Sequence, residues 1–521
     1  MAEKIIIDPI TRIEGHLKVE AVVDDGEVKD AKSSGTLFRG IELIMQGRDP
    51  RDAPRIAQRI CGVCPATHSV ASTQCVDSAF GITDKIPENG RIIRNLILGS
   101  NYIQSHILHF YHLAALDYVD VTQAADYVGN DPTLNSVKDF IGRGELAPFF
   151  PRYEGDYRLT KEADVAALSH YVQALEMRQK AHKMLAIFGG KMPHNCGVLP
   201  GGVTEIPTVD KITSLLWHLS DIRDFIDNVY IPDIIAIAHA YSDYFGIGQG
   251  CGNLLSYGGF DLESTEIDPA KRNRLLKQGA VSLSDVLNLS SLDTSKIAEQ
   301  VEHSWYDAPG NGHPSETKTI PLPDKEGAYS WLKSPRYDGK VYEVGPLARI
   351  CVTYLSGDAT VKNLVDSTLS EFDAEPTALL SVLGRHAARA LDCKFVADAM
   401  VQWVQELKIG EPVYYDYTLP EEGSGMGLVE GPRGALGHWI QVKDGKIANY
   451  QAVVPTTWNA SPRDNNDQPG PIEQALIGTK IRDPENPFEI VRIVRSFDPC
   501  LACSVHVLTL KRHTLGEFRV L

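Results

Sequence analysis

The sequence predicts an α+β fold that is mainly helical, with a bundle of long helices at the core and small peripheral β-units. Four long stretches have helical periodicity, two stretches alternate apolar and polar residues, and a Cys-x-x-Cys pair lies towards each end of the chain. The length of 521 residues alone favours three or four domains. A metal site between the N-terminal and C-terminal cysteine motifs argues instead for one intertwined domain.

The first stretch of alternation predicts a small β-unit at the N-terminus. Residues 4–32 alternate apolar and polar side chains and contain the hairpin turn sequence Val23-Asp-Asp-Gly26. After Gly35 the pattern becomes helical. The stretch from Cys64 to about Phe80 can form one helix, which places His68 one turn beyond Cys64 on the same face.

Four long helices are predicted to form the core. The first is apolar on nearly every side, as expected of a helix that is buried all round. The second has Thr160 as its N-cap and the third has a kink at Pro232. Their expected ranges are 92–118, 160–190, 209–244 and 376–407.

The remaining segments are expected to contain loops and short strands. Residues 120–158 carry many Gly, Pro and Asp residues and predict a loop with one short helix. Residues 246–345 predict turns and short strands of a surface lobe. Residues 426–455 return to a strand pattern, with a hairpin turn at Lys443–Lys446.

The composition is that of a large globular protein that does not bind nucleic acid. Hydrophobic residues make up 43% of the chain, and the formal net charge is −17. Phosphate binding requires clustered Lys and Arg, which this charge balance does not favour. No apolar run reaches the roughly 18 residues of a membrane span, and the N-terminus lacks the pattern of a signal peptide.

The cysteine pairs Cys61/Cys64 and Cys500/Cys503 are the strongest functional signal. Both sulfurs of such a pair lie on one side of a turn, so two pairs can offer four thiolates to a metal. Spacing alone leaves a structural zinc site open, and thiolates also suit iron and nickel. The other cysteines are expected to be small buried residues; they are Cys75, Cys196, Cys251, Cys351 and Cys393.

The sequence around these cysteines contains six specific motifs. They are R-x-C-G-x-C-x-x-x-H at 59–68, D-P-C-x-x-C-x-x-H at 498–506, R-I-E-G-H at 12–16, E-V-G-P-L-A-R at 343–349, G-P-R-G-A-L-G-H-W at 431–439 and V-V-P-T-T-W-N at 453–459. Together they resemble the large, catalytic subunit of nickel-iron hydrogenases, from residue 5 to the C-terminus. The resemblance implies reversible cleavage of H2 to protons and electrons.

The resemblance also implies a nickel-iron centre whose iron carries cyanide and carbon monoxide. Cys61 and Cys500 would be terminal nickel ligands, and Cys64 and Cys503 would bridge nickel and iron. His68 would donate a hydrogen bond to a bridging sulfur.

Four further residues would surround this centre. Arg433 would lie over the open metal position and act electrostatically, because its high pKa makes it a poor base. Pro432 and Leu436 would shape the pocket around the diatomic ligands. Thr456 would donate a hydrogen bond to a cyanide, an anionic acceptor in a dry site.

Cleavage of H2 leaves a proton that needs a nearby base. By resemblance, the terminal thiolate of Cys500 would take it first and Glu14 would be the first carboxylate relay. Asp498 would add negative charge beside the metals. Many relatives have an Asp where this chain has Ser105, so the acidic surroundings of the metals are expected to be reduced.

A second metal site is implied near the C-terminus. Glu42, His506 and the backbone carbonyl of Ala452 would bind magnesium or another hard divalent ion, with water as the remaining ligands. The mature domain would end at residue 506. Residues 507–521 would be a propeptide that an endopeptidase removes, after metal-insertion proteins have acted.

The resemblance further implies a heterodimer. An iron-sulfur small subunit would dock near the first cysteine pair, since this chain has no further cysteine set for an electron relay. Export with that subunit to the periplasm is expected, with a cytoplasmic location as the alternative and membrane contact only through partners. Two other interpretations stay open, a hydrogen sensor and a metal-free relative like a respiratory complex I subunit, although four retained cysteines argue against the second.

Overall fold

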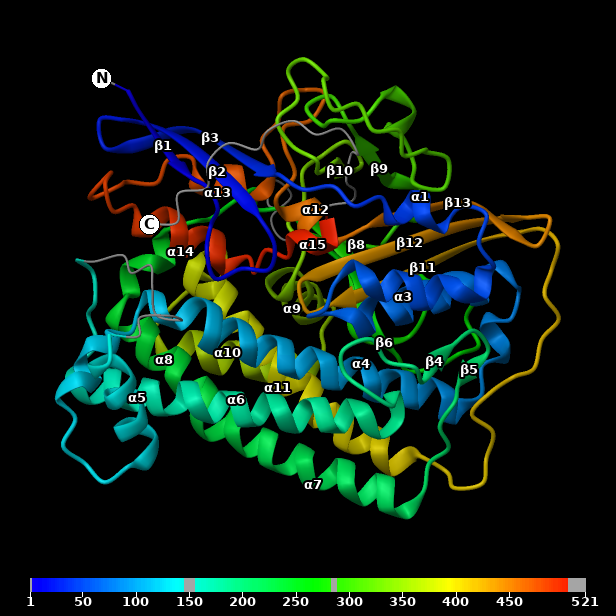
Figure 1. The fold of residues 1–521 in the computed structure, drawn as a ribbon, viewed down its shortest axis with the longest axis horizontal. Coiled ribbons are helices and arrows are strands. Elements are labelled where there is room, and N and C mark those ends of the chain that lie inside the picture. Colours follow the sequence, from blue (N-terminus) through cyan, green and yellow to red (C-terminus); the bar gives the residue numbers. More distant parts are fainter. Residues whose placement is uncertain (1, 145–154, 283–287, 505–521) are drawn as a thin grey trace.

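The computed structural model describes residues 2–144, 155–282 and 288–504, with only the backbone of Cys503 and Ser504. Four long helices lie side by side in one half of the molecule (Figure 1). They are α4 (Glu88–Leu108), α6 (Lys161–Gly189), α7 (Val209–Phe225) and α11 (Val382–Glu406). Helix α4 packs against α6 and α11, and α6 packs against α7. The predicted mixed, mainly helical α+β class is confirmed.

Side-chain caps decide where two of these helices begin. The Thr160 hydroxyl accepts a hydrogen bond from the Ala163 amide at 3.3 Å, as its predicted N-cap role requires. Helix α11 begins later than predicted, because the Ser381 hydroxyl accepts a hydrogen bond from the Gly384 amide at 3.0 Å. The residues before it, Pro376–Leu379, form a 3-10 turn instead.

Two predicted helices change their hydrogen-bonding pattern along their length. Helix α4 passes into a π-helical turn at His109–Ala114, so it is not a regular α-helix to residue 118. Helix α7 is separated from α8 (Ile231–Ala240) by a π-helical turn at Ile226–Tyr230. The irregularity lies just before Pro232, because proline has no N–H to donate to the preceding turn.

The N-terminal β-unit is a three-stranded antiparallel sheet. Its strands are β1 (Glu3–Ile7), β2 (Leu17–Asp24) and β3 (Glu27–Gly35), in that order. Asp25 and Gly26 connect β2 to β3 with φ angles of 53° and 71°. Both residues tolerate this left-handed conformation, which explains the predicted turn.

A second antiparallel sheet carries the first cysteine helix. Its strands are β11 (Gly423–Gly431), β12 (Gly434–Lys443) and β13 (Lys446–Val453). Helix α3 (Pro65–Ala79) lies directly on β11, because a Cβ on Gly427 would come 2.0 Å from the Ala71 carbonyl. The close approach brings the start of α3 to the turn between β11 and β12.

The prediction of a surface lobe at residues 246–345 is wrong for the first half of that range. Strand β6 (Leu254–Asp261) is buried, pairs with β7 (Arg274–Ser282) and packs against β11 and α9 (Pro346–Leu355). Seven of its eight residues are buried, as expected of a strand that is covered on both faces. The later strands β8 (Asn288–Ser290), β9 (Ile297–Gln300) and β10 (Ser334–Tyr337) complete this region, and β9 and β10 lie towards the top of Figure 1.

The remaining elements connect these layers. Short helices and strands are α1 (Ile41–Met45), α2 (Ala53–Ala57), α5 (Pro132–Gly142), β4 (Val198–Leu199), β5 (Gly202–Val203), α10 (Ala359–Glu371), α12 (Pro455–Asn459), α13 (Pro471–Leu476), α14 (Phe488–Ser496) and α15 (Leu501–Ser504). Among the described helices, none combines the length and the apolar character that crossing a bilayer requires.

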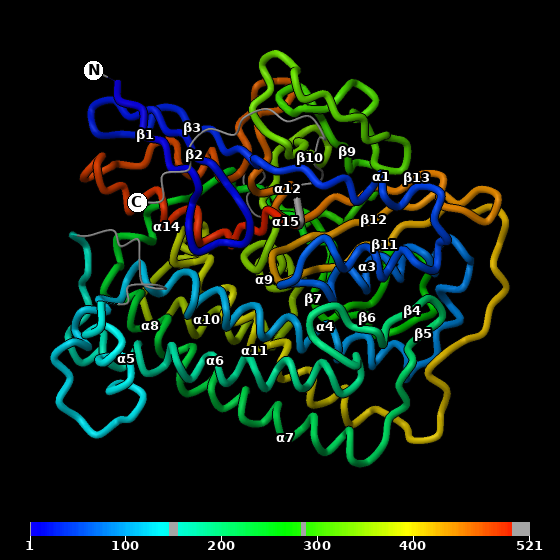
Figure 2. Tube along the Cα trace, in the orientation of Figure 1, coloured from blue at the N-terminus to red at the C-terminus, as the bar shows by residue number. Residues whose placement is uncertain are grey.

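The two ends of the described chain lie side by side. Figure 2 shows the blue N-terminal segment beside the red segment of α14 and α15, and Glu14 forms a parallel bridge with Cys500. Arg495, on α14, donates from Nε to the Thr11 carbonyl at 2.9 Å. The fold therefore brings the first and last motifs of the sequence to one place.

Candidate metal centre

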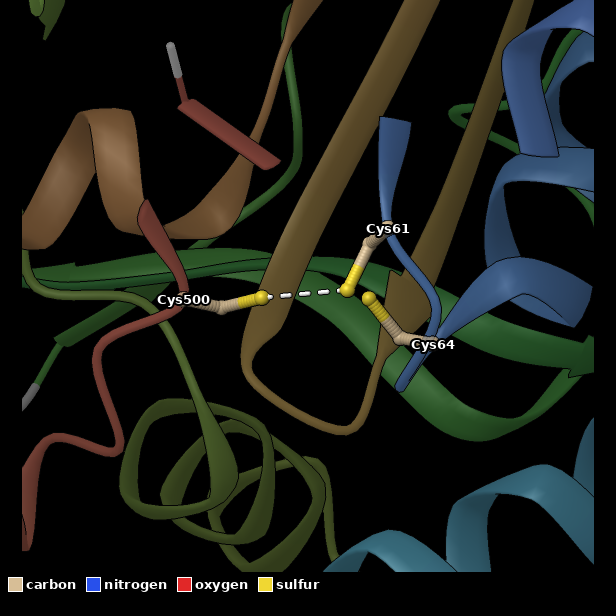
Figure 3. A group of neighbouring side chains, drawn as sticks. All are labelled: Cys61, Cys64 and Cys500. Carbon is tan, nitrogen blue, oxygen red and sulfur yellow. Dashed lines mark hydrogen bonds between the residues drawn. The ribbon is translucent and has the colours of Figure 1, made fainter. Parts of the chain in front are cut away.

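Three of the predicted thiolate ligands converge in the interior. Cys61 follows a 3-10 turn, Cys64 directly precedes α3, and Cys500 comes just before α15. Their sulfur atoms all lie within 4.8 Å of one another, and the Cys61 and Cys500 sulfurs are 3.3 Å apart (Figure 3). The side chain of Cys503 lies outside the described residues, so the fourth ligand stays a prediction.

The three sulfurs fit a soft transition-metal centre. Each cysteine is at most 6% exposed, so water cannot stabilise several thiolates at this spot. Metal ions would neutralise them, and soft thiolates favour ions such as nickel and iron. Among the described His, Cys, Asp and Glu residues, this is the one group that offers three converging ligand atoms.

Glu14 lies against this sulfur group. Its Oε2 is 3.2 Å from the Cys500 sulfur and accepts a hydrogen bond from the Ala502 amide at 2.8 Å. Burial, followed by the negative charge of Cys61, raises the pKa of the Glu14 carboxyl. Glu14 can therefore hold a proton at a higher pH than an exposed glutamate, in hydrogen-bonding contact with a thiol.

Arg433 is anchored beside the same group. Its Nη2 is 2.9 Å from Oδ1 of Asp498, its Nε donates to the Asp498 carbonyl at 3.1 Å, and its Nη1 donates to the Ser105 hydroxyl at 3.2 Å. Burial acts to lower the pKa of Arg433. The negative charges of Asp498 and of the neighbouring cysteine sulfurs outweigh this effect, so the pKa lies above its ordinary value. These contacts favour the charged form of the Arg433 guanidinium.

The other predicted neighbours of the metals are buried around this arginine. The Thr456 hydroxyl accepts a hydrogen bond from the Cys500 amide at 2.9 Å, which leaves its own hydrogen free to donate. Leu436 is 1% exposed. The Pro432 carbonyl accepts a hydrogen bond from Arg349 Nη2 at 2.9 Å, so the backbone before Arg433 is held in place.

His68 is buried one turn after Cys64, as predicted. The hydrogen bond described for its ring joins Nδ1 to Nε2 of His438 at 3.2 Å. Burial lowers the pKa of His68 to about 4, so the ring is neutral at physiological pH. The predicted hydrogen bond to a bridging sulfur stays a prediction.

Two of the three predicted magnesium ligands lie together. Glu42 is 4% exposed, and its Oε1 accepts a hydrogen bond from the Ala452 amide at 2.9 Å. Its Oε2 accepts a hydrogen bond from the Thr319 hydroxyl. His506 lies outside the described residues, so the complete ligand set stays a prediction.

The sequence interpretation missed the role of Arg349. Its Nη1 donates to the Gly431 carbonyl and its Nη2 to the Pro432 carbonyl, both at 2.9 Å, and its Nη2 is 2.6 Å from Oδ2 of Asp392. Arg349 thus holds the turn that carries Arg433. The motif E-V-G-P-L-A-R contains it, but only the contacts show what it binds.

The expectation that the other cysteines are buried is confirmed for two of them, holds only in part for two and is wrong for one. Cys196 is exposed, whereas Cys75 and Cys393 are buried and Cys251 and Cys351 are partly buried. Cys196 follows His194, whose φ of 62° belongs to an irregular loop. The residue type alone does not show whether a cysteine in a loop is exposed to solvent.

Comparison with known families decides what kind of centre this is. The family model described as nickel-dependent hydrogenase matches residues 39–506, and a model described as HoxL-like matches residues 4–34. The chain belongs to the nickel-dependent hydrogenase family.

Curated relatives of this hydrogenase subunit match it along nearly its whole length. The periplasmic [NiFeSe] hydrogenase large subunit of Desulfomicrobium baculatum is 44% identical over 512 residues, covering 97% of this chain and 95% of that relative. The hydrogenase-2 large chain of Escherichia coli K12 is 36% identical over 577 residues, covering 100% of both chains.

Solved hydrogenase structures are similar in fold as well. The reduced Ni-Fe-Se hydrogenase of D. vulgaris Hildenborough superposes with a TM-score of 0.85 at 44% identity, covering 97% of this chain and 100% of that one. An H2-activated [NiFeSe] hydrogenase of Dm. baculatum gives a TM-score of 0.87 at 42% identity, covering 97% and 100%. Those proteins are named for selenium as well as nickel and iron, whereas this hydrogenase offers cysteine at all four predicted ligand positions.

These comparisons confirm the general function predicted from the motifs. The protein is an oxidoreductase that acts on H2, it uses nickel and iron, and it is a large subunit that works with a small subunit. A purely regulatory hydrogen sensor is not favoured, because the matched relatives include an uptake hydrogenase, a periplasmic hydrogenase and hydrogenase-2.

Proposed function

We propose that the centre between Cys61, Cys64, Cys500 and Cys503 holds a nickel-iron pair whose iron carries cyanide and carbon monoxide. When bound, this group would supply the heterolytic cleavage of H2 and accept the electron pair. The observation that carries the proposal is the convergence of three buried sulfurs within 4.8 Å of one another. We further propose that Cys61 and Cys500 are terminal nickel ligands and that Cys64 and Cys503 are bridging.

Cys500 and Glu14 would move the proton that the cleavage releases. The Cys500 sulfur would hold it first, since a thiolate is the closest base to the metals. Oε2 of Glu14, at 3.2 Å, would take it next. The raised pKa of Glu14 supports this role, because a carboxyl that is protonated more readily is a better acceptor from a thiol.

The other side chains would stabilise charge and exclude water. The Arg433 cation, held by Asp498, would face the open metal position and stabilise negative charge there. The Thr456 hydroxyl would donate its free hydrogen to an anionic diatomic ligand. Pro432 and Leu436 would form the apolar wall around these ligands, and His68 would donate to a bridging sulfur.

The electrons would leave through an iron-sulfur small subunit docked near Cys61 and Cys64. Among the described residues, no second set of three converging metal-ligand side chains could carry an electron relay. A relative that is named periplasmic supports export of the assembled pair to the periplasm. Contact with a membrane would be made only through partners.

We also propose a magnesium or similar hard divalent ion at Glu42, the Ala452 carbonyl and His506. Residues 1–506 would form the mature domain. Metal-insertion proteins would load the centre, and an endopeptidase would then remove residues 507–521. An intact mass that still includes Leu521 in active enzyme would contradict the processing step.

The test uses the purified heterodimer. Nickel and iron are quantified, H2-dependent dye reduction is measured, and cyanide and carbon monoxide bands are sought by infrared spectroscopy. The Cys500→Ser variant is expected to lose all H2 oxidation, whereas Cys393→Ser, a matched change at another buried cysteine, is expected to retain it. Absence of diatomic bands from active wild-type enzyme would overturn the proposed centre.

A further inference from the structure

A chain of buried hydrogen bonds leads away from His68. Nδ1 of His68 is 3.2 Å from Nε2 of His438, and Nδ1 of His438 is 2.6 Å from the Tyr450 hydroxyl. That hydroxyl is 2.7 Å from the Ser72 hydroxyl. Each of the four residues is at most 1% exposed. The mechanism described above uses only the first of them.

This hydrogen-bond chain links helix α3 to the sheet formed by β11, β12 and β13. His68 and Ser72 lie one turn apart on α3, so they point to the same side of the helix. His438 lies on β12 and Tyr450 on β13, where Tyr450 pairs with Ile440. His438 and Ile440 share a face of the sheet, so His438 and Tyr450 are diagonal neighbours on that face.

The hydrogen atoms along this chain are coupled to one another. A neutral imidazole has one N–H and one bare nitrogen, and each close pair of atoms needs one hydrogen between them. Burial keeps His68 neutral, since its pKa is lowered to about 4. With His68 neutral and one hydrogen in each contact, two arrangements of the chain are possible. In one of them Nε2 of His68 carries the hydrogen, and in the other Nδ1 carries it.

We propose that His438 and Tyr450 are positioning residues that hold His68 in the tautomer with hydrogen on Nε2, so that it donates to a thiolate of the metal centre. The structure has the Tyr450 hydroxyl donating to Ser72. In the proposed arrangement the Tyr450 hydrogen turns to Nδ1 of His438, and the Ser72 hydroxyl donates to Tyr450 instead. Nε2 of His438 then donates to Nδ1 of His68. The inference rests on the proposed nickel-iron centre and on the proposed contact of His68 with a bridging sulfur.

The proposed contact with the metal centre selects this arrangement. A metal-bound thiolate sulfur can only accept a hydrogen bond, so the His68 nitrogen that faces it must carry the hydrogen. Because one hydrogen must occupy each contact, that requirement extends through His438 to Tyr450.

This hydrogen-bond chain fixes the positions of its hydrogen atoms but does not conduct protons to solvent. Ser72, at its far end, is fully buried and returns to the same helix as His68. A proton that reached Ser72 would therefore not be at the protein surface. The proton route at Glu14 lies on the opposite motif, next to Cys500, and is separate from this chain.

The test compares two Tyr→Phe variants of the loaded heterodimer by infrared spectroscopy. Tyr450→Phe removes the donor to His438, so a fraction of His68 rings lose the hydrogen on Nε2. The bridging sulfur becomes more electron-rich, and the carbon monoxide band is expected to shift to lower wavenumber. Tyr102→Phe is the matched control, because among the described residues the buried Tyr102 hydroxyl has no hydrogen-bond partner. Its band is expected not to move.

His68→Ala calibrates the measurement, because it removes the donor completely and is expected to give a downward shift at least as large. A shift in His68→Ala without one in Tyr450→Phe would overturn the role of the chain while the proposed centre stands. Wild-type enzyme without diatomic bands would overturn both. If Tyr450→Phe does not load metal, His438→Leu and His438→Gln replace it. Gln can donate a hydrogen bond to His68 and is expected to keep the wild-type carbon monoxide band, whereas Leu cannot donate and is expected to shift it. Equal bands in the two variants would refute the inference.

Discussion

The Cys500 sulfur lies 3.2 Å from Oε2 of Glu14, although 486 residues separate them in the sequence. Backbone contacts hold the two segments together, since the Leu501 amide donates to the Glu14 carbonyl at 2.7 Å. A candidate metal ligand and a candidate proton acceptor are therefore placed by the meeting of the two chain ends.

Replacing Glu14 by Gln is expected to block proton transfer and leave the metals in place. Gln is nearly isosteric but cannot take a proton, so H2 oxidation should fall by about 100-fold or more. Turnover and metal content are measured together. Glu20→Gln, a change on β2, is the control and should turn over normally. Normal turnover in Glu14→Gln would remove this residue from the proton route.

Replacing Gly15 by Ala is expected to push the two motifs apart. A Cβ on Gly15 would lie 2.8 Å from the Leu501 Cβ and 2.9 Å from the Ala502 amide nitrogen. Overpacking of this kind costs about 1–3 kcal/mol, and the positive φ of 80° adds to it. Denaturant unfolding measures the loss.

Gly47→Ala is the matched control for this change. Gly47 has a φ of 77°, but its added Cβ would meet nothing within 4 Å. It should therefore show only the cost of the backbone conformation. Equal losses in the two variants would mean that the Gly15 contact with the C-terminal motif is unimportant.

Replacing Thr456 by Val is expected to destabilise the Cys500 segment. The Cys500 amide would lose its acceptor at 2.9 Å, which costs about 1–3 kcal/mol for a buried donor. Thr456→Ser keeps the hydroxyl and should retain most of the stability. Under the proposed function, the cyanide bands should also shift in Thr456→Val and not in Thr456→Ser. Identical stability of the two variants would contradict the hydrogen bond.

Replacing Arg433 by Lys is expected to slow turnover although the charge is kept. Arg433 makes three contacts through three different nitrogens, and the single ammonium group of Lys cannot reproduce that geometry. A loss of about 10-fold or more is expected in dye reduction with H2. Arg51→Lys, at a mostly exposed position, is the control. Turnover equal to wild type would show that only the charge matters.

The stability of the fold is expected to fall as pH rises towards neutrality. Burial raises the pKa of Glu473 from 4.5 to about 7. The folded state therefore binds this proton more tightly than the unfolded chain does. Its contribution is complete below about pH 4.5 and is lost as the pH rises through 7, by about 3 kcal/mol at most.

Glu473→Gln should remove that part of the pH dependence. Urea unfolding of both proteins at about pH 5 and about pH 7.5 measures the difference. The wild type should lose more free energy of unfolding between the two values than the variant does. Parallel losses would show that Glu473 does not titrate in this range.

Local patterns predicted the parts of the fold that local interactions determine. The turn at Asp25-Gly26 and the cap at Thr160 depend on neighbouring residues only, so the sequence was sufficient. The burial of β6 was missed because α9 and β11 cover it, and neither is near it in the sequence. The sequence pattern did not predict helix α9 either, although the motif E-V-G-P-L-A-R runs into its start.

The candidate site shows the same division. The motifs predicted that Cys61 and Cys500 meet, and their sulfurs lie 3.3 Å apart. Two other contacts depend on elements that are distant in the sequence. They are the hydrogen bond from Arg349 to the Gly431 carbonyl and the contact of His68 with His438. Spacing within a motif carries no information about such partners.

The central claim is that these distant cysteines bind one nickel-iron pair. Anomalous diffraction from crystals of the processed heterodimer, at the nickel and iron absorption edges, tests it most directly. The account predicts one nickel and one iron peak, close together and within bonding distance of the Cys61, Cys64, Cys500 and Cys503 sulfurs. A single zinc peak at these sulfurs, or nickel and iron located elsewhere, would contradict it.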